Sequence, residues 1–246
     1  MNIGQELGVQ SYCFRHFQDN AKTAELVKEC GLTKLELCGV HVDFQDAEAS
    51  RKAVETYRAA GVEIVCTGVN RISGDEAVDR GLFEFSKLAG AKFMSMDFPP
   101  EAVPGCFRTA EKLADEYDVR VGIHNHGGRH WLGSSQALAW VFAQTSERVG
   151  LCLDTAWALH SHEDPVKMAE QFGDRLHGVH IKDFAFGPDG AHEDVVVGTG
   201  NLDLGALFEA MNAVDFAGAV VLEYEGDVED PVPALSRCVE AVRGVS

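Results

Sequence analysis

Short segments in the second half of the chain share one alternating pattern, and this pattern constrains the fold more than any other feature. In VRVGIHNHGG, residues 119–128, branched residues alternate with Gly122, His124 and His126. Successive side chains of a strand point to opposite faces, so one face is bulky and the other is small with a polar end. Such a strand fits a closed parallel barrel, where the bulky face packs on helices and the polar end faces a site.

The same alternation recurs in VGLCLD (149–154), LHGVHIKD (176–183) and GAVVLEYEG (218–226). The four expected strands carry polar residues on their small-residue faces, near their C-terminal ends: His124, Asp154, His180 and Glu223. Imidazoles and carboxylates that converge from neighbouring strands predict a metal site with four ligands. The alternative is four unrelated polar strand ends, which is the usual reading for any one of them alone.

The remaining chain completes eight strand and helix units. Earlier strands are expected at 8–12, 34–38, 62–68 and 92–98, and helices at about 20–30, 47–60, 103–117, 135–144, 165–172, 204–214 and 231–242, with another ending near residue 90. A length of 246 residues suits a barrel, which needs about 250. We therefore predict an α/β fold, a single (β/α)₈ TIM barrel over residues 1–246. An open doubly wound sheet is the alternative, but no glycine-rich phosphate loop follows the first strand.

Composition narrows the range of partners. The formal net charge of −18 argues against binding to nucleic acid or to anionic membranes. The seven cysteines are scattered, odd in number and never spaced as CxxC, which is typical of buried thiols in a reducing cytoplasm. The N-terminus lacks the pattern of a signal peptide, and no apolar run approaches the ~20 residues of a membrane span. We expect a cytoplasmic protein with a small-molecule substrate, and a homo-oligomer remains open.

Several motifs resemble the sugar phosphate isomerase/epimerase family, the xylose isomerase-like TIM barrels. The matching pieces are HNHGG at 124–128, LDTAW at 153–157, HGVHIKDF at 177–184, VGTGNLDL at 197–204 and LEYEG at 222–226. The resemblance implies the barrel fold and a divalent metal at the ends of strands five to eight, most often held by Glu, Asp, His and Glu. It leaves the substrate open, because the family is chemically diverse.

Carried over by position, the resemblance implies Asp154, His180 and Glu223 as metal ligands, with His124 at the fourth position. Ketose epimerases of this family have a glutamate there, and their two glutamates act as bases on opposite faces of the sugar carbon. His124 removes one of this pair. Trp157 also stands where related enzymes often carry a histidine. The inosose dehydratase branch has a histidine-rich fifth strand, which favours a lyase.

Two histidines and two carboxylates favour Mn, Co, Zn or Fe over Mg, which prefers oxygen ligands and water. A metal with an open position stabilises the enediolate that forms when a proton leaves the carbon beside a carbonyl. We assign Glu223 as base and ligand, with ligand alone as the alternative. Lys182, two residues beyond His180, is expected to protonate an oxygen, stabilise an oxyanion or bind a phosphate, with a surface lysine as the alternative. His126, two residues beyond His124, is expected to be a second acid/base group or an outer partner of a ligand.

Further substrate contacts are expected at the same mouth of the barrel. Aromatic side chains pack on the apolar faces of sugars, and polar groups bind hydroxyls or anions. These candidates are Glu36, Trp131, Trp157, Arg129 and His192. Structural or solvated roles are the alternative for each of them.

Four functions are compatible with this pattern. The first is a sugar isomerase or epimerase acting beside a carbonyl, and the second is a lyase or dehydratase of a keto-sugar or keto-inositol. The third is an endonuclease IV-like nuclease, which the negative charge disfavours. The fourth is a binding barrel without catalysis.

Overall fold

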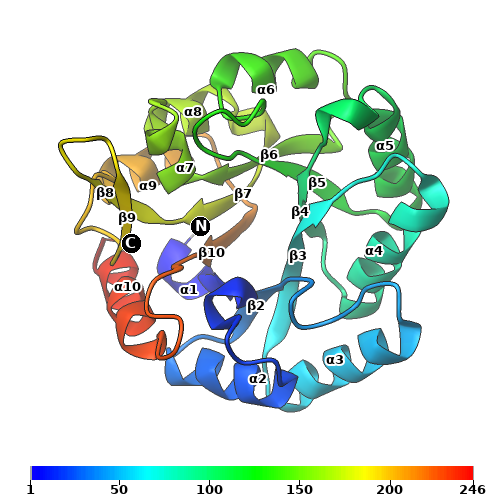
Figure 1. Ribbon diagram of the computed structural model, residues 1–246, viewed down its shortest axis with the longest axis horizontal. Coiled ribbons are helices and arrows are strands. Elements are labelled where there is room, and N and C mark those ends of the chain that lie inside the picture. Colours follow the sequence, from blue (N-terminus) through cyan, green and yellow to red (C-terminus); the bar gives the residue numbers. More distant parts are fainter. Residues whose placement is uncertain (1, 246) are drawn as a thin grey trace.

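The computed structural model describes residues 2–245 and contains a ring of eight parallel strands enclosed by helices (Figure 1). Around the ring the strands follow the order β1, β10, β7, β6, β5, β4, β3, β2. Their bounds are β1 Gly8–Gln10, β2 Lys34–Leu37, β3 Glu63–Arg71, β4 Phe93–Asp97, β5 Arg120–His124, β6 Val149–Asp154, β7 Leu176–Ile181 and β10 Ala219–Leu222. The prediction of a closed (β/α)₈ barrel is confirmed, and the open sheet is excluded.

Helices connect successive strands and cover the outside of the ring. They are α1 Ile3–Glu6, α2 Asn20–Glu29, α3 Ala47–Ala59, α4 Glu76–Ala89, α5 Gly105–Tyr117, α6 Ser135–Phe142, α7 Thr155–His160, α8 Pro165–Gln171, α9 Leu204–Ala213 and α10 Val232–Val245. Side chains of Asp19, Asp46 and Asp75 accept hydrogen bonds from the first free amides of α2, α3 and α4. Helix α4 ends at Gly90, whose φ of 85° suits glycine.

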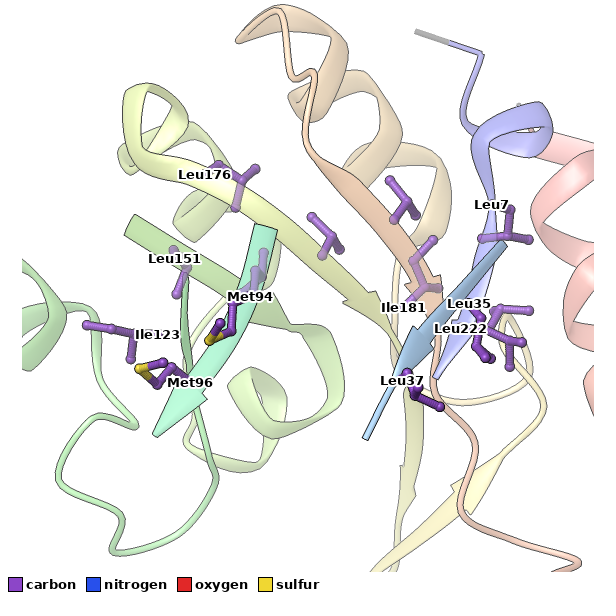
Figure 2. Packing of buried hydrophobic residues seen from close by; sticks show 14 of the residues in the cluster. Leu7, Leu35, Leu37, Met94, Met96, Ile123, Leu151, Leu176, Ile181 and Leu222 are labelled. Carbon is purple, nitrogen blue, oxygen red and sulfur yellow. The ribbon is translucent and has the colours of Figure 1, made fainter. Parts of the chain in front are cut away.

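The two faces of the strands have the different roles that their alternation predicts. On the outer face, branched and long side chains such as Ile123, Leu151 and Ile181 join the large core between strands and helices (Figure 2). Complete burial of such a side chain stabilises the fold by about 1.5–3 kcal/mol. On the inner face, the ring of Phe93 fills the space that glycines leave. A Cβ at Gly122 or at Gly178 would lie only 2.5 Å from this ring.

One part of the barrel departs from the predicted layout. The segment between β7 and α9 contains an antiparallel hairpin that the predicted units did not include, β8 Asp183–Phe186 and β9 His192–Val195. The Asp183 carboxylate accepts four backbone N–H groups between Gly198 and Leu202, at 2.9–3.0 Å. This buried carboxylate therefore fixes the start of the segment VGTGNLDL beside the hairpin.

All seven cysteines are buried and free, as their scatter along the sequence predicts. Cys66 and Cys152 lie inside the barrel with Phe93 and Val221. Among residues 2–245, none of the helices combines the length and the apolar character needed to cross a membrane.

Candidate metal centre

Four buried side chains meet at the C-terminal mouth of the barrel: His124, Asp154, His180 and Glu223. His124 Nε2 lies 3.1 Å from His180 Nδ1 and 3.5 Å from Asp154 Oδ2. Glu223 Oε2 lies 2.8 Å from His180 Nδ1 and 3.7 Å from His124 Nε2. The expected convergence of two imidazoles and two carboxylates from four neighbouring strands is therefore present.

The spacing of these donor atoms fits a coordinated cation. A tetrahedron with metal–ligand distances of about 2.1 Å has edges of about 3.4 Å, and the four separations lie on both sides of that value. Asp154 Oδ2 is buried without a hydrogen-bond partner in the described chain. Buried polar atoms are normally paired, so this oxygen marks a position that a cation satisfies. The residues fit the metal that the resemblance implies.

The end of β6 orients Asp154. Its Oδ1 accepts the Trp157 N–H at 2.8 Å and so caps α7, which leaves Oδ2 for the centre. Asn125 joins the backbones of the two strand ends, because its Oδ1 accepts Asp154 N–H at 2.8 Å and its Nδ2 donates to Asp154 C=O at 2.9 Å. Sequence reasoning missed Asn125, although it lies directly after a predicted ligand in HNHGG.

Carboxylates and imidazoles shift each other's protonation at this mouth. Burial acts to lower the pKa of His124, but Asp154 and Glu223 raise it above its usual value. Burial acts in the same way on His180, and Cys152, Glu36 and Glu223 raise its pKa well above the usual value. Burial acts to raise the pKa of Glu223, but Lys182 and the two histidines hold it well below its usual range. The centre therefore attracts positive charge.

Lys182 lies beside the centre, fully buried. Its Nζ pairs with Glu225 and lies 3.5 Å from Asp194 Oδ2, over the rings of Trp157 and Phe184 at 5.5 and 5.6 Å. Burial acts to lower the pKa of Lys182, and surrounding carboxylates, first Glu223, raise it above its usual value. The ammonium is thus engaged by carboxylates, which is a poor arrangement for binding a phosphate.

Asp194, on β9, is a titratable group that sequence reasoning missed. Burial raises the pKa of its carboxyl group to about 7, against the opposing effect of Lys182. Asp194 Oδ2 also accepts the Glu225 N–H at 3.2 Å. An acid that changes protonation near neutral pH is a candidate for proton transfer. No sequence motif marked it, because its position depends on how the hairpin packs against the segment that follows β10.

His126 lies beside His124, with ring centroids 4.6 Å apart, and beside His130 at 4.8 Å. Burial lowers the pKa of His126 to about 4, so this imidazole is neutral at pH 7. Asp97, His126 and His130 form a second group of possible ligands. His130 Nδ1 accepts the Leu132 N–H at 3.3 Å, so its Nε2 carries the proton and faces Asp97 Oδ1 at 3.2 Å. This second group is an imidazole close to a carboxylate, beside a second, neutral imidazole.

The other expected substrate contacts lie in the loops around the mouth. Trp131 is half-buried, and its Nε1 donates to Phe98 C=O at 2.7 Å. Trp157 packs edge-on against Phe184 and His192, with centroids 5.0 and 5.3 Å apart. Arg129 is exposed in the loop after β5. The ring of exposed His192 lies 4.4 Å from that of Phe184 within the hairpin, and its contact with Trp157 joins the hairpin to α7.

Comparison with known proteins identifies the fold family. The family model described as a xylose isomerase-like TIM barrel matches residues 101–242, more than half of the chain. No match to a curated protein was found.

Several solved structures share the whole fold at low sequence identity. The IOLI protein with a bound zinc atom has 16% identity and a TM-score of 0.76, over 97% of this chain and 98% of that one. The 3-keto-D-glucoside 4-epimerase YcjR from E. coli has 18% identity and a TM-score of 0.69, over 98% and 99%. The probable 3-DHS dehydratase AsbF from Bacillus anthracis has 13% identity and a TM-score of 0.76, over 96% and 98%.

Proposed function

This chain belongs to the family of xylose isomerase-like TIM barrels, and we propose that it is a divalent-metal-dependent isomerase or epimerase of a sugar or sugar derivative. The proposed reaction removes the proton on the carbon beside a carbonyl group. The observation that carries the proposal is the four-donor cluster, in which Asp154 Oδ2 has no hydrogen-bond partner within residues 2–245. Two imidazole ligands favour Mn, Co, Zn or Fe over Mg.

Bound at these four side chains, a divalent cation supplies a Lewis acid for the carbonyl oxygen of the substrate. Glu223 Oε2 lies 2.8 Å from His180 Nδ1 and 3.7 Å from His124 Nε2, so we assign this oxygen to the metal. We assign the other oxygen, Oε1, to accept the proton from the substrate carbon. Lys182 and His126 are the proposed acid/base groups beside the metal centre. The buried setting of the four side chains keeps bulk water away and strengthens each of these electrostatic effects.

A lyase is the second candidate, and it is favoured by the histidine at position 124. Transfer of a proton between opposite faces of one carbon needs two bases, and at this position the chain offers an imidazole that faces Asp154 and Glu223. Elimination of water needs one base and one acid. Glu223 provides the base, and Asp194, with a pKa of about 7, is suited to be the acid.

The direct test is exchange of carbon-bound hydrogen in heavy water. We expect the zinc- or manganese-loaded protein to incorporate deuterium beside the carbonyl of at least one member of a panel of keto-sugars and keto-inositols, followed by NMR. An isomerase or epimerase also forms a second sugar, whereas a lyase forms an enone that absorbs in the ultraviolet.

The Glu223→Gln variant tests the assigned base. We expect it to lose deuterium incorporation, and the matched Glu193→Gln variant, at an exposed position on β9, to retain it. Full exchange by Glu223→Gln would remove Glu223 from the chemistry. Absence of metal binding in the unmodified protein would refute the proposed function itself.

A further inference from the structure

Glu36 is completely buried on β2, across the barrel from the metal centre. Its Oε2 lies 2.7 Å from His180 Nε2 and accepts the Cys66 thiol at 3.2 Å, while its Oε1 accepts the Ser95 hydroxyl. The backbone at Gly68 also lies close to this carboxylate, since a Cβ added to Gly68 would be only 2.9 Å from Oε1. Both oxygens therefore already have partners within the protein, and the closest polar contact, to His180, joins this carboxylate to the metal centre.

The contact with Glu36 determines which nitrogen of His180 faces the cluster. A carboxylate accepts a proton, so Nε2 carries the hydrogen that faces Glu36, and Nδ1 is the nitrogen whose lone pair a cation uses once it displaces any proton there. That Nδ1 lies 2.8 Å from Glu223 Oε2 and 3.1 Å from His124 Nε2, among the other donors. The lone pair is thus directed at the position of a cation.

His124 provides an internal contrast. Its Nε2 faces the cluster, but its Nδ1 is buried with no hydrogen-bond partner among residues 2–245. The nitrogen of His180 that points away from the cluster contacts the Glu36 carboxylate, whereas the corresponding nitrogen of His124 has no such contact within residues 2–245. An outer carboxylate that holds a ligating histidine fixes its tautomer and increases its basicity, and its loss typically weakens metal binding by about 10- to 100-fold.

We propose that Glu36 is a positioning residue for the metal centre, which acts through the Nε2–H of His180 rather than by contacting substrate. The inference depends on the proposed metal dependence, and it goes further by assigning this carboxylate a role. It predicts that Glu36 controls how tightly the protein holds a cation, whichever sugar the enzyme converts.

The test compares Glu36→Gln with Ser95→Ala in zinc binding, measured by competition with a chromogenic chelator. Both substitutions remove part of the same hydrogen-bond group, but only Glu36→Gln removes the charge that faces His180. We expect zinc affinity to fall by about 10- to 100-fold in Glu36→Gln and to stay near the original value in Ser95→Ala. Equal zinc affinities for Glu36→Gln and the unmodified protein would overturn the inference.

A second measurement needs no variant. In the zinc-loaded protein, nitrogen-15 NMR of the histidine rings should show that His180 holds zinc through Nδ1 and a proton on Nε2. Zinc on Nε2 would overturn the role of Glu36 while leaving the metal dependence intact. A protein that binds no zinc at all would refute both proposals, so the two failures are distinguishable.

Discussion

Strand β7 carries a buried histidine near each end, and the two differ in their chemistry. At the N-terminal mouth, His177 Nδ1 donates to the Val121 C=O at 3.2 Å, and burial lowers its pKa to about 4, with Arg120 and Arg175 acting in the same direction. At the other mouth, carboxylates raise the pKa of His180 well above its usual value despite burial. The surroundings therefore make one imidazole a neutral structural group and the other a site for positive charge.

The charged groups around the two histidines differ in the same way. The basic residues at the N-terminal mouth pair near the surface, as Lys92 does with Asp118 at 3.1 Å and Arg148 with Asp115 at 2.8 Å. Lys182 at the C-terminal mouth is fully buried among carboxylates. Exposed ion pairs contribute little to stability, whereas a buried charge requires its partners. This difference between exposed and buried charges is expected if the N-terminal mouth has a structural role and the C-terminal mouth holds the reactive groups.

Replacing each histidine of β7 in turn is expected to give the largest difference between the two mouths. We expect His180→Ala to weaken zinc binding by more than about 100-fold, because a direct ligand matters more than its outer partner. His177→Ala should leave zinc binding unchanged. Chelator competition measures both, and an equal loss in the two variants would contradict a special role for the C-terminal mouth.

Lysines test the same contrast through stability. Lys182→Met takes the buried cation away from the part-buried carboxylates of Asp194 and Glu225. Because both carboxylates keep some contact with water, we expect a loss of up to about 3 kcal/mol in the free energy of unfolding, at the lower end of the cost of breaking a buried pair. Lys92→Met removes an exposed pair and should cost less than about 1 kcal/mol. Urea unfolding at neutral pH gives both values. Equal costs would show that Lys182 is better solvated than its burial indicates.

His177 predicts a loss of stability in acid. Its pKa is lowered on folding from 6.5 to about 4, so the folded state resists protonation that the unfolded state accepts. The contribution is fully present above pH 6.5 and is lost as the pH falls towards 4, by about 3 kcal/mol. Urea unfolding across this range should show a smaller decrease for His177→Gln, which keeps a donor for Val121 but does not titrate. A parallel decrease in both proteins would assign the acid sensitivity elsewhere.

His124 and His180 predict that metal binding also weakens as the pH falls, but for a different reason. Their raised pKa values mean that protons compete with the cation up to a higher pH than for an ordinary histidine. Zinc affinity should therefore rise between about pH 6 and 8, by up to about tenfold per pH unit for each displaced proton. Calorimetry in buffers of different ionisation enthalpy counts those protons. A flat profile without proton release would exclude both imidazoles as ligands.

The barrel and the four donors could be predicted because both depend on a local period of two. Alternation placed His124, Asp154 and His180 on the inner faces of adjacent strands, and parallel strands bring equivalent ends together. The family resemblance independently implied the same mouth of the barrel. Neither argument needs knowledge of side-chain contacts between distant segments.

The outer layer of the site could not be predicted in this way. The partner of Glu36 is 144 positions away along the chain, and the contact arises only when β2 and β7 face each other across a closed ring. Asp194 depends on the hairpin, whose short strands carry no clear alternation. Asp183 belongs to a recognised motif, but the four backbone amides that it binds appear only in the folded loop.

The seven buried thiols provide a way to measure how often parts of the folded protein open transiently. A thiol-modifying reagent reaches a cysteine only when the surrounding segment separates, so each modification rate measures a local or global opening. Cys66 and Cys152 lie within the ring of strands, whereas Cys30 follows α2 on the outside. The order in which these cysteines react, read by mass spectrometry with and without zinc, would show which wall of the barrel separates first.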